Sequence, residues 1–376
     1  MRKKDKSNKI LIIYFIIIIL IAGINGETKV EYGENLAIPI GVGYDLKIKS
    51  DNEPVYKIPI SYYLFQINEN ITSKVKTGES ISVLETRSKR QMKLDKKFFI
   101  GLEKVFLFNE EMAKDGIDNV IELIFNSTKM NEYAHIAVCK EKSSDILAHK
   151  IEGYVSSADY IEGILKSLKF GYFFEDEFKI IDIYTRMLSE GRTVLMPYIE
   201  MCEEDIVVTG LALFKNYKMI KKLNLQEVKI LNILTSKNGN GELVLIDKFD
   251  RRISASALSN RKVKVSKVKD KYKFLININL DLTIENDQFG KGISTYNNSS
   301  EKVIKMFNEL VERHCKDFIR KMQDEYKIDL LELGRIAAAK YGRRTGVDWD
   351  EVVSDSEIDI KVNSKIVTTG KGNFKH

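Results

Sequence analysis

The sequence predicts an exported α+β protein of two or three domains. Three observations favour this class: apolar residues alternate in some segments and recur every three or four residues in others, an apolar run follows a basic N-terminus, and the 376 residues are 44% hydrophobic and 30% charged. At roughly 100 to 200 residues per domain, this length and composition supply enough apolar material for more than one core. With 4 Pro and 22 Gly, the chain is not collagen-like or of low complexity.

Residues 1–26 have the pattern of an export signal. The apolar run extends from Ile10 to about Ile24 and is preceded by five basic residues, Arg2, Lys3, Lys4, Lys6 and Lys9. A run of about 15 residues matches a signal-peptide core and is shorter than the roughly 20 residues of a membrane span. A cleaved signal and a retained N-terminal membrane anchor both remain open. Either one places the rest of the chain outside the cytoplasm, because a basic N-terminus stays inside.

Beyond this segment the chain is almost neutral. The formal net charge is +6 for the whole sequence, and it falls to +2 once the five basic residues and Asp5 are set aside. A dedicated nucleic-acid binder would carry a larger basic excess, so no nucleic acid is expected as a partner. The three cysteines, Cys139, Cys202 and Cys315, lie far apart in sequence and form no CxxC pair, so neither a disulfide framework nor a metal site is predicted.

Residues 27–202 are predicted to form an N-terminal mixed α/β region, with room for two subdomains. Strands are expected at 36–44, 56–67, 98–108 and 134–139, and helices at 80–92, 109–125 and 144–147. Pro59 should place its strand at a sheet edge or a bulge, because proline has no N–H to donate. Glu110 and Glu111 suit the positive N-terminal end of a helix.

A short polar stretch at 203–205 marks the expected boundary, so residues 203–376 are predicted to form a C-terminal α+β domain. Strands are expected at 207–214, 243–246, 272–284 and 358–367, and the glycines of 238–241 indicate a hairpin turn. The strand at 272–284 has seven apolar residues at period two, so one face should be buried and the other wet.

A long amphipathic helix is predicted from Ser299 or Ser300 to about Tyr326. Its apolar stripe consists of Val303, Ile304, Phe307, Leu310, Val311, Cys315, Phe318, Ile319 and Met322. Such a stripe packs a helix against a sheet. His314 and Cys315 are adjacent in sequence and diverge by about 100° around a helix, so they are interpreted as packing residues rather than ligands.

No enzyme signature is present in the sequence. The four histidines form no HExxH motif, and the chain contains no GxSxG, GxxxxGK[ST] or GxGxxG motif. No catalytic, cofactor-binding or metal-binding residue is therefore predicted, no cofactor is expected, and the residues of any binding site are unknown. One alternative remains, a secreted hydrolase of cell-envelope polymers that uses carboxylates from the acidic runs 175–177 and 203–205.

A second alternative is a peripheral membrane-surface protein. Lysine alternates with valine at 261–269, a pattern typical of an exposed strand whose lysines protect a sheet edge from aggregation. The same lysines could contact anionic lipid headgroups, each contributing about 1 kcal/mol near the surface. The edge-strand interpretation is favoured, because the alternation itself requires a wet face.

The order of segments resembles the C subunit of bacterial spore germinant receptors, the GerAC or Ger(x)C family. The N-terminal pieces are 35–38 (NLAI), 41–45 (GVGYD), 77–81 (TGESI), 106–117 (FLFNEEMAKDGI) and 145–147 (DIL). The later pieces are 195–197 (LMP), 210–215 (GLALFK), 329–334 (DLLELG), Trp349 and the closing strand. Each piece alone has low specificity, but the ordered set covers nearly the whole chain.

The resemblance implies an elongated, non-enzymatic subunit at the outer face of the spore inner membrane. It implies two integral membrane partners, the A- and B-type receptor subunits, and a role in nutrient-triggered germination; whether this subunit touches the nutrient is not implied. Family members usually carry a lipid-modified cysteine directly after the apolar run, where this chain has Ile24, and residues 27–34 lack the expected Trp-Asp pair. We therefore expect tethering by the retained N-terminal segment or by the partners.

Overall fold

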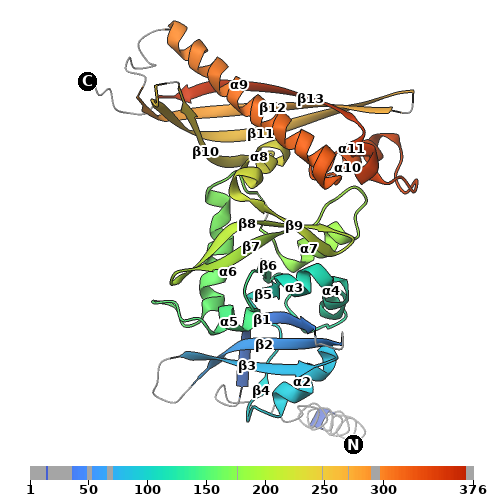
Figure 1. The fold of residues 1–376 in the computed structure, drawn as a ribbon. Helices are drawn as coiled ribbons and strands as arrows, with labels where there is room; N and C mark the ends of the chain where they lie inside the picture. Colours follow the sequence, from blue (N-terminus) through green and yellow to red (C-terminus); the bar gives the residue numbers. More distant parts are fainter. Residues whose placement is uncertain are drawn as a thin grey trace, which may run out of the picture.

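The computed structural model describes residues 14–15, 36–48, 53–65, 71–175, 177–247, 249–269, 271–288 and 297–369. The predicted export segment, residues 1–26, lies outside this part of the chain apart from Tyr14 and Phe15. No helix within the described ranges is long and apolar enough to cross a membrane. The molecule is an elongated α+β protein in which sheets and helices follow one another along one axis (Figure 1), as predicted.

A nine-stranded mixed sheet forms the N-terminal part of the described chain, from Leu36 to Asn224. Eight strands follow the order β3-β2-β1-β5-β6-β7-β8-β9, and β4 pairs with β1 beside this path. The first five are β1 (Leu36–Ile48), β2 (Pro54–Leu64), β3 (Thr72–Ser80), β4 (Lys97–Phe98) and β5 (Val105–Asn109). The others are β6 (His135–Cys139), β7 (Leu195–Cys202), β8 (Asp205–Lys215) and β9 (Lys218–Asn224).

Helices cover both faces of this sheet. One face carries α2 (Val83–Gln91), α3 (Glu110–Asp115), α4 (Asp118–Phe125) and α7 (Ile180–Met187). The other carries α5 (Ser143–Ala148) and α6 (Ser157–Ser167), which continues into the 3-10 turn η2 (Leu168–Phe170). All five residues of β5 and all five of β6 are buried. These strands read as continuous apolar runs because neither of their faces meets water.

The C-terminal part contains a four-stranded sheet covered on one face. Its strands run β10 (Gly239–Ile246), β11 (Arg252–Val268), β12 (Lys271–Asp287) and β13 (Glu357–Thr368), and β13 pairs in parallel with β12. Its helices are α8 (Leu225–Thr235), α9 (Asn297–Lys321) with the π-helical turn η4 (Met322–Tyr326), α10 (Leu333–Tyr341) and α11 (Trp349–Ser354). The other face of the sheet carries polar residues such as Asn277 and Asn279.

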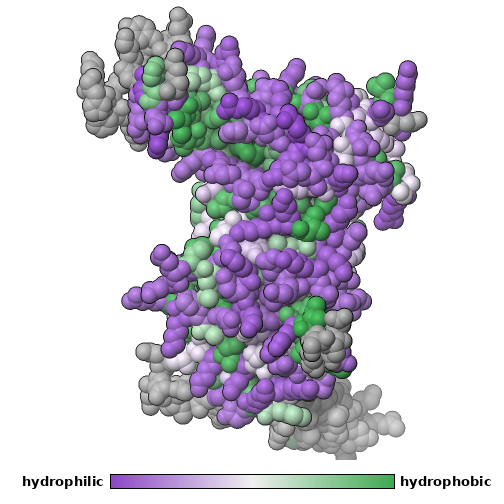
Figure 2. Space-filling view, viewed as in Figure 1, coloured by the Kyte–Doolittle hydropathy of each residue, from purple (hydrophilic) through white to green (hydrophobic). Residues whose placement is uncertain are grey.

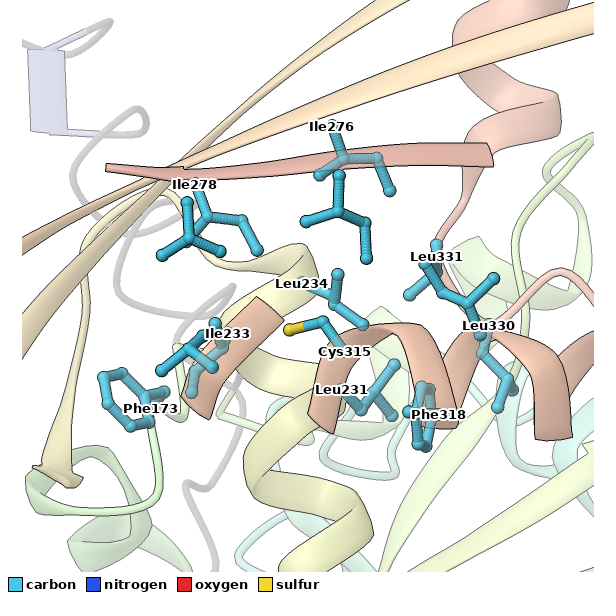
Figure 3. Close-up of a cluster of buried hydrophobic side chains, with 14 of the residues drawn as sticks. Phe173, Leu231, Ile233, Leu234, Ile276, Ile278, Cys315, Phe318, Leu330 and Leu331 are labelled. Atoms are coloured by element: carbon cyan, nitrogen blue, oxygen red, sulfur yellow. The ribbon is translucent and has the colours of Figure 1, made fainter. Parts of the chain in front are cut away.

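One hydrophobic core joins the two sheets. Leu211 and Leu213 of β8 belong to the same buried cluster as Leu231 of α8 and Phe274 of β12. Figure 3 shows Cys315 of α9 lying among Leu231 and Leu234 of α8, with the β12 residues Ile276 and Ile278 nearby. Helix α8 is therefore the layer through which the nine-stranded and four-stranded sheets contact each other.

The predictions made from clear periodicity are confirmed. The strand expected at 272–284 is β12, and Ile276, Ile278, Leu280 and Leu282 are fully buried on one face. The long helix is α9, which begins at Asn297 and passes into η4 before ending at Tyr326. Phe307 is fully buried and Phe318 is 5% exposed, so the stripe packs against the sheet.

The helix predicted at 109–125 is two helices. Asn109 caps α3 by accepting a hydrogen bond from Met112 N at 2.9 Å. The helix ends at Gly116, whose φ of 143° is open to glycine and disfavoured for other residues. Ile117 N then donates to Tyr217 O at 3.1 Å, which turns the chain before α4 begins at Asp118.

The strand expected at 98–108 is two strands, because β4 ends at Phe98 and β5 begins at Val105.

Two further local predictions were wrong. Pro59 does not lie in an edge strand, because β2 is interior, between β3 and β1, and the bulge in the β1–β2 pair lies opposite Ser61 and Tyr62 rather than at Pro59. Residues 239–241 open strand β10 instead of forming a hairpin turn. There Phe173 N donates to Asn240 O at 2.9 Å, and a Cβ on Gly241 would lie 2.6 Å from the Phe173 ring. The glycine therefore serves a close approach between segments that are distant in sequence.

The expected boundary between residues 202 and 203 falls at the turn that joins β7 to β8. These strands pair antiparallel from Leu195 opposite Leu213 to Cys202 opposite Asp205, so the sheet continues across this point. The division into units at 27–202 and 203–376 stays a prediction.

Candidate functional site

The two acidic runs have local structural contacts. Glu175 accepts hydrogen bonds from the backbone N–H groups of Lys237 and Asn238, which anchors the start of β10, and Glu177 pairs with Lys179. The second run lies at the β7–β8 turn, where Glu204 O lies 2.8 Å from His149 Nε2. Asp176 lies outside the described residues. No contact in the described part of the chain joins the two runs into one carboxylate pair.

The lysine-valine segment lies on the C-terminal half of β11. Strand β10 pairs with β11 only as far as Ser259, and beyond it β11 pairs with β12 alone, so this half is an edge as predicted. Lys262 and Lys264 are exposed. Farther across the sheet, Lys273 pairs with Glu357 and Asp359, with Nζ 3.1 Å from the latter. The sheet therefore carries charges of both signs.

His314 and Cys315 lie on different faces of α9, as predicted. His314 is exposed, whereas Cys315 is fully buried in the shared core. Burial raises the pKa of the Cys315 thiol and also that of Cys139. Both thiols are therefore held in the protonated, unreactive form.

Polar residues of the motif segments hold backbone together. Asp45, at the end of GVGYD, is 4% exposed and accepts hydrogen bonds from Ser143 N at 2.6 Å and Ser144 N at 3.1 Å. It thereby binds the N-terminal turn of α5 to β1. Asn109 both caps α3 and accepts a hydrogen bond from Leu46 N at 3.2 Å. These hydrogen bonds show that Asp45 and Asn109 of the motif segments have structural roles.

A carboxylate surrounded by three arginines lies where the two sheets meet. Glu332 Oε1 lies 2.6 Å from Arg186 Nη1 and 3.2 Å from Arg192 Nε, and its Oε2 lies 3.3 Å from Arg335 Nε. The side chains of Glu332 and Arg186 are each 13% exposed. Burial alone would raise the pKa of Glu332, but the three guanidinium charges outweigh it and lower that pKa. This Glu332 cluster joins α7 and the following loop to α10.

Asp329 organises the backbone that leads into α10. It is 1% exposed, and its carboxylate accepts hydrogen bonds from Leu331 N, Leu333 N and Gly334 N at 3.2, 3.0 and 2.6 Å. Its own N–H donates to Asp350 Oδ1 at 2.9 Å. Burial, reinforced by the charge of Asp350, raises the pKa of Asp329 to about 7 despite these donors.

A cavity of about 310 Å³ lies beneath α2 at the N-terminal end of the molecule. Its walls are largely apolar and come from the sheet, from α4 and from residues 97–100: Val42, Tyr44, Ile58, Ile60, Leu123, Phe98 and Ile100. Helix α2 contributes Arg87 and Arg90, and Glu103 lines another part of the wall. We call this space the α2 cavity.

The charged groups of the α2 cavity are bound differently from those of the Glu332 cluster. Arg90 is 4% exposed, its Nη1 donates to Ile58 O at 3.1 Å, and its Nε has no hydrogen-bond partner among the described residues. Arg87 Nη2 contacts only Met130 Sδ, at 3.9 Å, within the described chain. Glu103 is 2% exposed and accepts from Gly101 N at 3.1 Å and Asn131 N at 3.2 Å, and burial raises its pKa.

Sequence reasoning did not find this cavity. Helix α2 reads VLETRSKRQ, and its charged residues are typical of a solvated helix face. The TGESI segment was expected to open this helix, but its residues 77–80 end strand β3 and α2 begins only at Val83. It was the only signal in the region, and it indicated family resemblance rather than a cavity.

Comparison with known proteins finds similarity along most of the chain. A family model described as "Spore germination protein N-terminal domain" matches residues 31–201, and one described as "Spore germination B3/ GerAC like, C-terminal" matches residues 209–370. The spore germination protein GerQC of Bacillus cereus is 19% identical over 282 residues, which cover 72% of this chain and 76% of that protein.

Among solved structures, the chain is similar to the GerBC protein. The TM-score is 0.55 with 17% sequence identity, over 87% of this chain and 97% of the GerBC chain. At this identity the likeness shows a shared fold.

Proposed function

Because the chain belongs to the GerAC-like family of spore germination proteins, we propose that it is the C-type subunit of a nutrient germinant receptor, working beside A- and B-type integral membrane subunits. The observation that carries the proposal is the match of both family models, in order, over residues 31–201 and 209–370. The role is non-enzymatic: the subunit binds its partners and biases the state of the assembly.

The leading segment and the shape of the chain support the proposed location. Residues 1–26 carry the export pattern, and β1 begins at Leu36, only a short connection beyond them. In this proposal, the end of the molecule that holds β1–β3 and α2 lies nearest the outer face of the spore inner membrane, and β10–β13, at the opposite end (Figure 1), extend away from it. With Ile24 in place of the family's cysteine, the retained segment or the partners tether the chain.

Two features of the far end support a binding role. Strand β10 is an edge of the four-stranded sheet, and its Val244 and Ile246 side chains are 44% and 54% exposed. Figure 2 shows apolar residues gathered over this end of the molecule on an otherwise largely hydrophilic face. An exposed apolar edge strand is a surface that another chain can cover.

The test is a crosslinked pull-down of the tagged, full-length protein from dormant-spore membranes, with untagged spores as the control. Mass spectrometry of the companions and of the mature N-terminal peptide is the readout. We expect two integral membrane proteins to co-purify, and the N-terminal peptide then distinguishes a retained anchor from a cleaved signal. Recovery of the protein alone from the soluble fraction, without residues 1–26, would overturn the proposal.

A salt wash of the same membranes separates this role from simple surface attachment. Lysine contacts to lipid headgroups are screened at high ionic strength, whereas an anchor or a partner complex is not. At 1 M salt the Debye length falls to about 3 Å, so contacts between surface charges are screened. We expect the protein to stay with the membrane under these conditions and to leave it only in detergent. Release by salt would instead favour attachment through Lys262 and Lys264.

A further inference from the structure

The α2 cavity contains a buried cation that no carboxylate of the described residues neutralises. Arg90 is only 4% exposed, yet its Nε has no hydrogen-bond partner among the described residues. Its side chain donates to Ile58 O through Nη1, and its guanidinium carbon lies 5.5 Å from the centre of the Phe98 ring. Burial lowers the pKa of Arg90 to about 10, so the guanidinium is still charged at neutral pH. A buried charge without a counterion is costly, and proteins rarely keep one without a use.

Arg87 adds a second guanidinium to the same cavity. It lies one helical turn before Arg90 on α2, and within the described chain it contacts only the weak acceptor Met130 Sδ, at 3.9 Å. Neither arginine forms an ion pair with a described carboxylate. Glu103, the acid that lines the cavity, is instead held by the N–H groups of Gly101 and Asn131. Helix α2 thus offers the cavity two adjacent cationic donors, and Lys97 adds a third cationic side chain to the wall.

The rest of the cavity wall indicates the size and polarity of the ligand's uncharged part. Val42, Ile58, Ile60 and Leu123 are apolar, and Tyr44 and Phe98 add ring faces. A volume of about 310 Å³ is at the lower end of the range for small-molecule sites. A guanidinium fork matches a planar carboxylate in two parallel hydrogen bonds, whereas a multiply charged anion would be repelled by an ionised Glu103.

We propose that the α2 cavity binds a small organic carboxylate with a compact apolar body, held by Arg87 and Arg90. The carboxylate replaces the missing counterion, and the apolar body fills the space between the sheet and α2. This proposal rests on the cavity residues and does not depend on the receptor role, so either one can fail without the other.

The test uses benzoate as the probe and benzamide as its neutral isostere. Isothermal titration calorimetry of the detergent-solubilised full-length protein measures both. We expect saturable benzoate binding, at least about tenfold tighter than benzamide, because a charge-assisted hydrogen bond is lost with the amide. Arg87→Gln should weaken benzoate binding by at least about tenfold. Lys89→Gln removes an equal charge from the same helix outside the cavity and should leave the affinity unchanged.

A second readout locates the probe. In protein labelled with ¹³C at the methionine methyl groups, benzoate should shift the Met130 signal, since Met130 lines the cavity, and leave that of Met322, which is buried in the C-terminal core. Met130→Leu assigns the signal. The proposal would be overturned if benzoate binding did not saturate, or if benzamide bound with equal affinity. It would also be overturned if Arg87→Gln left the benzoate affinity unchanged, or if benzoate did not shift the Met130 signal.

Discussion

The molecule holds two groups of buried or half-buried arginines that differ in what they face. In the Glu332 cluster, Arg186, Arg192 and Arg335 surround one carboxylate, and every group belongs to an element of the junction between the sheets. In the α2 cavity, Arg87 and Arg90 have no described carboxylate partner. Partly buried charges contribute to a fold when they are paired and cost it free energy when they are not. The comparison therefore assigns assembly to the first group and ligand binding to the second.

The largest expected effect comes from breaking the Glu332 cluster. Glu332→Gln leaves three guanidinium groups around a neutral side chain, and removing one partner of a buried pair costs about 3 kcal/mol or more. We expect the free energy of unfolding, measured by urea denaturation, to fall by about 3 kcal/mol.

An exposed ion pair supplies the matched control. Glu357→Gln removes one of the two partners of Lys273, and the side chains of Glu357 and Lys273 are 63% and 44% exposed. It should change the free energy of unfolding by less than about 1 kcal/mol. If both variants lost the same free energy of unfolding, burial would not make the Glu332 cluster more stabilising than an exposed ion pair.

A smaller, pH-dependent effect is expected from Asp329, beside this cluster. Burial raises its pKa to about 7, far above its ordinary value of 3.8, so between these values the folded protein holds a proton that the unfolded chain has released. Stability from this group is therefore present at low pH and is lost as the pH rises through 7. Between pH 5 and 7 the loss should be about 2 kcal/mol.

Asp329→Asn isolates this contribution from the other acids. Asp350 raises the pKa of Asp329 and Arg261 lowers it, and both remain in the variant. The variant will be less stable at every pH, because an amide offers one oxygen to the N–H groups of Leu331, Leu333 and Gly334. The slope of its stability against pH should be flatter than that of the parent protein. If stability depended on pH with the same slope in both proteins, a group other than Asp329 would be responsible for the pH dependence.

The sequence predicted the parts of the fold that depend on local pattern. The period of two in β12 and the three- and four-residue spacing in α9 each follow from one buried face. The interior position of Pro59 and the early start of β10 at residues 239–241 depend on partners distant in sequence, such as Phe173, and no local pattern predicts them. The segments that carried the family resemblance lie within only some of the elements, and they gave no information on how the strands pair.

The candidate sites escaped sequence reasoning for the same reason. Glu332 meets Arg186 across 146 residues and Arg192 across 140, so its role is invisible in its own segment. Arg87 and Arg90 stand among charged neighbours on α2 and look like a solvated helix face. Only the three-dimensional arrangement shows that Arg90 is 4% exposed and lines a cavity.

The smallest expected effect separates the two groups most directly, because it predicts a change of sign. Arg90→Met removes an uncompensated buried charge, keeps a side chain of similar length, and places sulfur against Phe98, which is a favourable contact. The hydrogen bond to Ile58 O is lost, at a cost of about 1 kcal/mol, while the relief of desolvation is larger. We expect the free energy of unfolding to rise by about 1 kcal/mol.

The same substitution in the other group should act in the opposite direction. Arg186→Met leaves Glu332 with less positive charge around it and should lower the free energy of unfolding by about 3 kcal/mol in the same urea titration. If Arg90→Met also destabilised the protein by more than about 1 kcal/mol, Arg90 would be a structural residue like Arg186. If Arg90→Met instead stabilises the protein, the arginine is not needed for folding, and its place in the cavity is explained by the ligand that it binds.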